Sequence, residues 1–267
     1  MAFADVNGVS MYYEVHGEGP PVVFAHGSGG NHISWWQQIP YFSKYYKCVI
    51  FDHRTFGRTP DELEPKGRTA FADDLEGLLN HLGIDRTAIV AHSMGGRTAS
   101  VFSMRNPERV SALVLSGTNG GSDNEESREV RRKHKAAPPF LPEGAIKALS
   151  PEFSERFPEK SLLYRQIMRM NPRHSPDFLA PRPNHNDSTD GRFRDLGIPM
   201  LFMVGKEDKL VHPKTIEIAS SLIPHSEFIM VNRAGHSVYY ERPEFFNDLV
   251  HKFLKINLTS STNLKRE

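Results

Sequence analysis

The sequence predicts an α/β fold built on a doubly wound, mostly parallel sheet with an inserted helical cap. Three observations support this prediction. Short, uniformly apolar runs recur along the chain, as expected of strands that are covered on both faces. Segments with helical spacing of apolar residues alternate with these runs. One long stretch, 120–195, carries no strand pattern and interrupts the alternation, which indicates an insertion into a single domain.

The first half of the chain opens with an expected antiparallel pair. The extended runs 3–6 and 9–15 are joined by Asn7-Gly8, a strong two-residue hairpin signal. The elements expected after this pair are an apolar strand at 22–25, a helix at 33–45 and a second apolar strand at 49–51.

A helix capped by Thr69 is expected to run to His81, with Gly83 ending it. The strand 88–91 then leads into a helix that stops near Asn106-Pro107, because proline restricts the residue before it. A further buried strand is expected at 112–115.

Beyond the insertion the alternation resumes. The expected elements are a strand at 199–204, a helix at 213–222, a strand at 227–231 and a final helix from 243 through 254. The predicted division of the chain is a core, 1–119 and 196–258, a helical cap, 120–195, and a polar C-terminal tail, 259–267.

Composition narrows the function classes. The formal net charge of +1 over 267 residues gives no strong field toward nucleic acid or anionic membranes. No apolar run is long enough to span a bilayer, and the N-terminus lacks the pattern of a signal peptide. Cys48 is the single cysteine and lies in an apolar strand, so we expect a small core residue and a cytoplasmic protein.

Polar groups follow four of the expected strands: residues 26–28, Ser93, Asp208 and His236. The carboxyl ends of parallel strands meet at one edge of the sheet, so these groups are expected to lie together. A serine hydroxyl needs a base to act as a nucleophile, and the base needs a partner that fixes its tautomer. Ser93, Asp208 and His236 supply these three roles in an order known for such triads.

These motifs resemble the α/β-hydrolase fold superfamily, specifically its small cap-bearing esterase and lactonase-like members, over nearly the whole chain. The five motifs are His26-Gly27-Ser28-Gly29 with Trp36 beyond it, Asp52-x-Arg54-x-x-Gly57-Arg58, Ala91-His92-Ser93-Met94-Gly95-Gly96, Gly205-x-x-Asp208-x-x-x-x-Pro213 and Ala234-Gly235-His236.

The resemblance implies Ser93 as nucleophile, Asp208 as acid and His236 as base, with the backbone N–H groups of Ser28 and Met94 as oxyanion donors. It also implies that no cofactor is needed. Two positions depart from the pattern of the superfamily. Ala91 replaces the usual first glycine of the turn at the nucleophile, and Thr55 replaces a glycine that is common after the Asp-x-Arg loop.

Competing assignments exist for each role. Glu207 and Asp123 are alternative acids, and His53 is an alternative base. His92 and His26 are further alternatives for the base, but we expect His92 to pack under the nucleophile and His26 to order its loop. The spacing of the histidines matches no common zinc pattern, so no metal is expected. Candidate residues of the substrate pocket are His26, Gly27, Trp36, His92, Phe140 and Phe153, with packing in the core or cap as the alternative role of the aromatic ones.

The sequence therefore predicts a serine hydrolase that cleaves carboxylic esters or lactones, small-molecule substrates, through an acyl-enzyme on Ser93. One alternative is a hydrolase of carbon–carbon bonds in ring-cleavage products, although those proteins often carry tryptophan where this chain has Ser237. Another alternative is a small-molecule receptor that retains the triad. Binding to nucleic acid and a membrane span are not expected, and the oligomeric state is left open.

Overall fold

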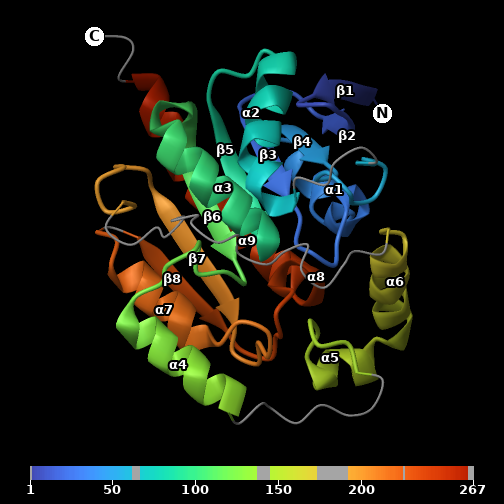
Figure 1. The fold of residues 1–267 in the computed structure, drawn as a ribbon, viewed down its shortest axis with the longest axis vertical. Coiled ribbons are helices and arrows are strands. Elements are labelled where there is room, and N and C mark those ends of the chain that lie inside the picture. The colour runs from blue at the N-terminus through green and yellow to red at the C-terminus, as the bar shows by residue number, and fades with distance from the viewer. Residues whose placement is uncertain (1, 62–66, 137–144, 173–191, 225, 264–267) are drawn as a thin grey trace.

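The structure is a computed structural model that describes residues 2–61, 67–136, 145–172, 192–224 and 226–263, the last five of these by their backbone alone. In these residues a single eight-stranded sheet runs through the molecule in the order β1-β2-β4-β3-β5-β6-β7-β8 (Figure 1). The strands are β1 (Ala2–Val6), β2 (Val9–His16), β3 (Pro21–Ala25), β4 (Lys47–Phe51), β5 (Thr87–His92), β6 (Val110–Ser116), β7 (Met200–Gly205) and β8 (Glu227–Val231).

The pairing of the strands confirms the predicted sheet. β1 pairs with β2 and β2 with β4 in the antiparallel sense, and every other neighbouring pair is parallel. The hairpin between β1 and β2 turns at Asn7 and Gly8, whose φ angles are 47° and 82°. Positive φ at both central residues matches the right-handed twist of the strands, and asparagine and glycine tolerate it best.

The buried strands divide their apolar side chains between two core clusters. On β3, Val22 and Phe24 belong to one cluster, while Val23 and Ala25 belong to the other. The same alternation holds on β5 and β6, because successive side chains of a strand point to opposite faces. Strands that are apolar at every position therefore require helices on both faces of the sheet.

Helices cover both faces as that pattern requires. Side chains of α2, α3 and α7 join one cluster, and those of α1, α8 and α9 join the other. In Figure 1, α2 and α3 lie in front of the sheet and α9 lies behind it. The bounds of these helices are α1 (Ile39–Phe42), α2 (Phe71–His81), α3 (Met94–Arg105), α7 (Pro213–Ser221), α8 (Val238–Glu241) and α9 (Pro243–Asn263).

Three helices lie between β6 and β7 in the described part of the chain. α4 (Glu125–Ala136) lies beside α7, away from α5 (Pro151–Arg156) and α6 (Pro158–Arg169), as Figure 1 shows. The side chain of Phe193, near the end of the same segment, is buried in the core cluster with α2, α3 and α7. The helices α5 and α6 instead join the core cluster of α1, α8 and α9, through Phe153, Tyr164 and Ile167.

Four local predictions differ from the structure. The helix expected at 33–45 is two short pieces, a 3₁₀ turn at His32–Trp35 and α1, because Pro40 lacks the N–H that a continuous helix would need. Thr69 lies inside a 3₁₀ turn, Gly67–Ala70, and does not cap α2, whose first flanking residue is Ala70. The helix α8 was not predicted. The backbone of α9 continues to Asn263, into the expected tail.

Other local predictions are confirmed. The N–H of Ile84 donates to the carbonyl of Leu79 at 2.9 Å beyond Gly83, whose φ is 62°, so α2 ends with glycine in the left-handed conformation. Cys48 is fully buried, and this burial raises its pKa to about 12. The thiol is therefore a core group. Within the described ranges, every helix is too short or too polar to cross a lipid bilayer.

Candidate active site

Ser93 lies at a sharp turn between β5 and α3. Its φ and ψ angles are 50° and −115°, outside the regions that residues with a side chain prefer. Its N–H donates to the carbonyl of Ser116 on the neighbouring strand β6 at 2.9 Å, which holds this conformation in place. The side chain is partly exposed. Such a turn points a hydroxyl out of the sheet at the N-terminus of a helix.

Small residues make this turn possible. A Cβ atom on Gly95 would lie 2.3 Å from the carbonyl oxygen of Ala25, so the first turn of α3 crosses the end of β3 in contact with its backbone. Ala91 is fully buried on β5 and accommodates the turn where the superfamily usually has glycine. Thr55, the other departure, adopts a φ of 67°, the left-handed conformation that glycine would favour.

His236 and Asp208 form a buried pair beside Ser93. Asp208 follows β7 and His236 follows β8, and the histidine Nδ1 lies 2.7 Å from the aspartate Oδ2. The other carboxylate oxygen accepts the N–H groups of Leu210 and Val211 at 2.8 and 2.9 Å, which fixes the orientation of Asp208. A carboxylate at Nδ1 holds the proton on that nitrogen and leaves Nε2 as the acceptor.

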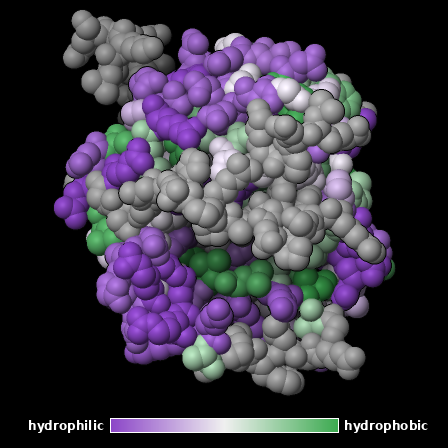
Figure 2. Space-filling model, in the orientation of Figure 1, coloured by the Kyte–Doolittle hydropathy of each residue, from purple (hydrophilic) through white to green (hydrophobic). Residues whose placement is uncertain are grey.

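A cavity of about 280 Å³ brings Ser93 and His236 together. It has no acidic, lysine or arginine side chain among its described lining residues. Figure 2 shows a band of hydrophobic residues set back in this face, with the hydrophilic surface of α4 below and to its left. The lining residues are Gly27, Ser28, Gly29, Gly30, His92, Ser93, Ala148, Tyr164, Met168, Leu210, Val211, His236 and Tyr239.

The loop after β3 lines this cavity with residues 27–30. The N–H of Gly30 donates to the carbonyl of Gly27 at 2.9 Å and closes a turn that contains Ser28. A Cβ on Gly27 would lie 3.1 Å from the Cβ of Ser93, so this loop packs directly on the nucleophile candidate. Met94 is the first residue of α3, and the first N–H groups of a helix have no partner within it.

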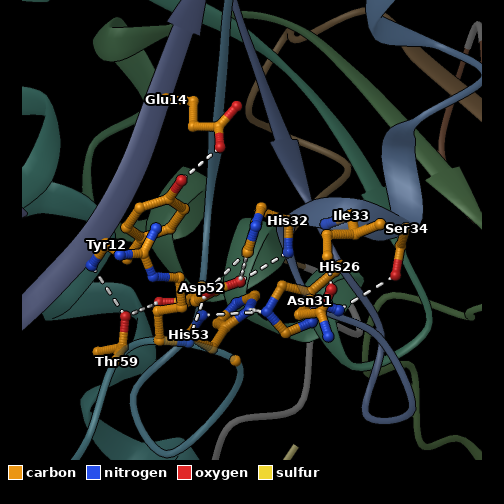
Figure 3. Close-up of polar contacts among 12 residues, drawn as sticks. Tyr12, Glu14, His26, Asn31, His32, Ile33, Ser34, Asp52, His53 and Thr59 are labelled. Atoms are coloured by element: carbon orange, nitrogen blue, oxygen red, sulfur yellow. Dashed lines mark hydrogen bonds and ion pairs between the residues drawn. The ribbon is translucent and has the colours of Figure 1, made fainter. Parts of the chain in front are cut away.

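Behind the loop, two histidines join it to α3. Backbone N–H and Nδ1 of His53 lie 3.0 and 3.1 Å from Nε2 of His26, and Nε2 of His53 lies 3.1 Å from Oγ1 of Thr98 (Figure 3 shows both rings). Burial lowers the pKa of His26 and lowers that of His53 further, so both rings are neutral. One proton assignment satisfies every contact, with Nδ1–H of His26 donating to the carbonyl of Gly27 at 2.8 Å.

A second histidine–aspartate pair lies beside this network. Nδ1 of His32 is 2.9 Å from both carboxylate oxygens of Asp52, which also accept the backbone N–H groups of His32 and Arg58 at 2.6 and 2.7 Å (Figure 3). His32 lines a different cavity, of about 290 Å³, which does not include Ser93. The ring of His32 also packs on that of Tyr12 of β2, with centroids 4.6 Å apart.

The alternative acids and bases are placed elsewhere. Asp123 pairs with Arg128 and Arg131 on the exposed surface of α4. His53 belongs to the buried network. The ring of His92 packs on that of His236 with centroids 4.7 Å apart, donates from Nδ1 to the carbonyl of Ser116 and, being buried, has a pKa well below its usual range. Asp208 is the acid that the structure pairs with His236.

The structure places the pocket candidates differently from one another. Gly27 and His92 line the cavity at Ser93, whereas His26 is buried behind it. Trp36 was wrongly expected there: the 3₁₀ turn directs Trp35 into the core and leaves Trp36, 40% exposed, on the cavity of His32. Phe153 packs on Phe157 and Tyr240 away from Ser93. Phe140 lies outside the described residues.

Several residues at the site were not predicted. The side chains of Tyr164 and Met168 reach the cavity from α6, and the Tyr164 hydroxyl lies 2.8 Å from Oγ of Ser237. The carboxylate of Glu241 accepts the N–H groups of Gly235 and Ser150 at 2.9 and 3.0 Å, which joins the loop of the histidine to the start of α5. No motif in the sequence marks these residues, although Tyr164 and Met168 lie in the segment 120–195 that was expected to be helical.

Among the described residues, no cluster of three or more histidine, cysteine, aspartate or glutamate side chains is arranged to hold a metal ion.

Comparisons with known proteins bear on the family of this chain. A protein of Agrobacterium fabrum named as a carbamate hydrolase, RutD, is 27% identical in an alignment 270 residues long that spans 91% of this chain and 98% of the relative. A thermophilic esterase from Thermogutta terrifontis, solved with malate bound, is 27% identical with a TM-score of 0.76, covering 96% of this chain and 97% of the other. Est816, described as an enzyme that degrades N-acyl homoserine lactones, is 25% identical with a TM-score of 0.73, covering 92% and 98%.

The sequence profile of the family described as alpha/beta hydrolase fold matches residues 20–243, which is most of the chain. The matched region contains Ser93, Asp208 and His236 together with the loops that position them. By this match and by its sheet topology, the chain is a member of the alpha/beta hydrolase fold family.

Proposed function

We propose that this protein is a serine hydrolase of carboxylic esters or lactones, with Ser93 as nucleophile, His236 as general base and Asp208 as the acid that orients it. The observation that carries the proposal is the cavity that Ser93 and His236 share, together with the 2.7 Å contact between His236 and Asp208. The similarity to an esterase and to a lactone-degrading enzyme, each over nearly the whole chain, supports the choice of substrates.

In the proposed reaction, Oγ of Ser93 attacks the carbonyl carbon while Nε2 of His236 takes the hydroxyl proton. The negative charge moves to the carbonyl oxygen, where the N–H groups of Ser28 and Met94 stabilise it. The carbon–oxygen bond to the alcohol then breaks and His236 returns the proton to the departing oxygen. Water, activated by the same histidine, hydrolyses the acyl-enzyme and regenerates Ser93.

We further propose that the insertion 120–195 acts as the cap, with α5 and α6 as the part that meets substrate. Tyr164 and Met168 of α6 line the cavity, and Ala148, just before α5, does so as well. The N–H of Ser237 donates to the carbonyl of Ala148 at 3.0 Å, so the cap is hydrogen-bonded to the loop that carries His236. Substrate selection therefore depends on residues that the core motifs do not include.

The test is hydrolysis of a p-nitrophenyl ester series and of simple lactones by the wild type and by Ser93→Ala. We expect kcat to fall by at least about a thousandfold in the variant, because removal of the nucleophile leaves only binding and oxyanion stabilisation. Ser10→Ala, at an exposed position on β2, is the matched control and should retain wild-type activity. Thermal unfolding of each protein verifies that it is folded.

A second measurement does not need the substrate. A fluorophosphonate should form an adduct on the wild type that peptide mass spectrometry places on Ser93, and Ser93→Ala should remain unlabelled. Adduct formation without turnover of any ester or lactone would contradict the proposed reaction and favour a receptor or a carbon–carbon hydrolase. Equal activity of Ser93→Ala and wild type would remove Ser93 from the mechanism.

A further inference from the structure

Tyr164 belongs to the insertion 120–195, and its hydroxyl meets the loop of the candidate base. The residue lies on α6, is buried and lines the cavity that Ser93 and His236 share. Its hydroxyl oxygen lies 2.8 Å from Oγ of Ser237, the residue that follows His236. Burial raises the pKa of Tyr164 to about 12, so both hydroxyls are uncharged at neutral pH and one donates to the other. The insertion therefore reaches the residue next to the base through a buried hydrogen bond.

The hydroxyl of Ser237 is not used as serine usually is at this position. Ser237 directly precedes the first turn of α8, where a serine side chain commonly accepts an N–H of that turn. Here the side chain forms no such cap, and only the carbonyl of Ser237 accepts the N–H groups of Tyr240 and Glu241, at 2.9 and 3.0 Å. The hydroxyl contacts Tyr164 instead. The loop of the base thus gains a contact that the helix after it forgoes.

Tyr164 can hold a loop in place because α6 is itself held near both ends. Near its start, the carbonyl of Lys160 accepts the hydroxyl of Tyr240 at 2.6 Å. Near its end, the carbonyl of Ile167 accepts an N–H from Nδ2 of Asn31 at 3.1 Å. The rings of Tyr164 and Tyr240 also pack edge to face, with centroids 4.9 Å apart. The helix is therefore joined to α8 on one side and to the loop after β3 on the other.

The ring and the backbone of His236 are held by different parts of the chain. Asp208 contacts Nδ1 and sets the rotation of the ring. The distance from Nε2 to the hydroxyl of Ser93 also depends on the backbone that carries the histidine. Just after it, the insertion holds Ser237 at two points, the N–H through the segment before α5 and the hydroxyl through α6. A reacting group displaced by about 1 Å can lose about a hundredfold in rate, so this support bears on the reaction.

We propose that Tyr164 is a positioning residue of the reaction: its hydrogen bond to Ser237 holds the backbone that carries His236. That contact keeps Nε2 of the histidine within reach of the Ser93 hydroxyl. This inference rests on the proposed hydrolase function. The insertion then sets the rate of the reaction through the base, in addition to selecting the substrate through the residues that line the cavity.

The test compares two tyrosine hydroxyls that join α6 to α8. Tyr164→Phe removes the hydroxyl that contacts Ser237, and Tyr240→Phe removes the one that contacts Lys160. With p-nitrophenyl butyrate, kcat per folded molecule should fall about 3- to 10-fold in Tyr164→Phe, the usual net value of one hydrogen bond, while KM changes less than about twofold. Tyr240→Phe should retain the wild-type kcat. Equal loss of kcat in both variants, or a loss confined to KM, would assign the effect to the docking of α6 and overturn the proposal.

Ser237→Ala removes the same contact from the other side. It should lower kcat by the same factor as Tyr164→Phe, and the double variant should lose little more, because both substitutions remove one hydrogen bond. Losses that multiply in the double variant would show that the two hydroxyls act separately, which would overturn the proposal. Thermal unfolding and circular dichroism of every variant give the folded fraction by which kcat is corrected.

Reaction with a fluorophosphonate separates this proposal from the proposed function, because it requires the base and the nucleophile but no substrate. The second-order rate constant for labelling Ser93 should fall in Tyr164→Phe by the same factor as kcat and stay unchanged in Tyr240→Phe. Wild type that labels but hydrolyses no ester or lactone would contradict the hydrolase function, while slower labelling of Tyr164→Phe would still support the positioning of His236. Unchanged labelling and turnover in Tyr164→Phe would contradict the role of Tyr164 alone. Wild type that neither labels nor hydrolyses would overturn both.

Discussion

His236 and Asp208 form one buried histidine–aspartate pair, and His32 and Asp52 form another. The contact distances are alike, 2.7 Å in the first pair and 2.9 Å in the second, and both carboxylates also accept backbone N–H groups. The difference lies in the cavities that the two histidines line. The ring of His236 lines a cavity with Ser93, whereas His32 lines one without that residue. A paired histidine is therefore evidence of a reaction only when a nucleophile lies beside it.

The largest expected effect tests that difference directly. Asp208→Asn should lower kcat per folded molecule by about four orders of magnitude, because the amide no longer holds the histidine in the reactive tautomer. Asp52→Asn should reduce kcat far less, since its histidine contacts no substrate. Steady-state assays corrected for the folded fraction by circular dichroism make the comparison. Equal loss of kcat in the two variants would place Asp52 in the reaction and erase the distinction.

The second expected effect is on stability. The Asp52 carboxylate accepts the backbone N–H groups of His32 and Arg58, one on each oxygen. Asp52→Asn replaces one of these acceptor oxygens by an NH₂ group, which can only donate. A buried donor left without an acceptor costs about 1–3 kcal/mol, so the free energy of unfolding should fall by that amount. Urea denaturation measures it. An unchanged midpoint would mean that water or a rotated side chain satisfies the donor.

Glu241 is a buried carboxylate that, unlike Asp208 and Asp52, is not paired with a histidine. Burial is the largest influence on its pKa and raises it to about 7, against the two backbone N–H groups that favour its charged form. The folded state then binds a proton more tightly than the unfolded state. Its contribution to stability is fully present below the ordinary pKa of 4.5 and is lost as pH rises through about 7, by up to about 1.4 kcal/mol per pH unit.

Glu241→Gln, which does not titrate, should lack this loss. The buried rings of His26, His53 and His92 act in the opposite sense, because their pKa values are lowered. Their contribution is present above pH 6.5 and is lost as pH falls below it. The unfolding free energies of wild type and Glu241→Gln are measured between about pH 4.5 and 8. Their difference gives the contribution of Glu241, since the histidine contributions are the same in both proteins and cancel. If the unfolding free energies of the two proteins changed in parallel with pH, that result would contradict the raised pKa of Glu241.

The smallest expected effect concerns buried histidines without a carboxylate. Thr98→Val keeps the shape of the side chain but removes the hydroxyl that lies 3.1 Å from Nε2 of His53. The free energy of unfolding should fall by about 0.5–1.5 kcal/mol, the usual net value of one hydrogen bond. Thr98→Ser retains the hydroxyl and is the control. A loss of equal size in Thr98→Ser would assign the effect to the methyl group.

The strands, and the loops that carry Ser93, Asp208 and His236, could be predicted from sequence because both depend on short-range signals. A run such as 112–115, apolar at every position, requires burial on both faces of a sheet. The carboxyl ends of parallel strands bring their loops to one edge of the sheet, whatever residues the loops contain. The helix prediction at 33–45 failed because its apolar spacing is real but Pro40 breaks the hydrogen-bond ladder. The missing N–H donor of Pro40, and not the apolar periodicity, determines the structure of that segment.

The walls of the cavities could not be predicted in the same way. Tyr164 and Met168 reach the site from α6, and no periodicity within a helix states how it docks on a distant loop. On α3, the guanidinium of Arg97 packs against the backbone of Gly121, a contact that no local pattern in either segment indicates. These contacts are set by tertiary packing, which local sequence patterns do not encode.

The backbone of Ser93 has a consequence for engineering this protein. A residue with a side chain in such a conformation costs about 1–3 kcal/mol, which the surrounding fold must offset. Glycine adopts the same angles freely, so Ser93→Gly would relieve this cost and delete the proposed nucleophile in a single substitution. A library selected only for melting temperature would therefore enrich inactive proteins at this position. Directed evolution of a more heat-resistant variant has to select turnover in the same round.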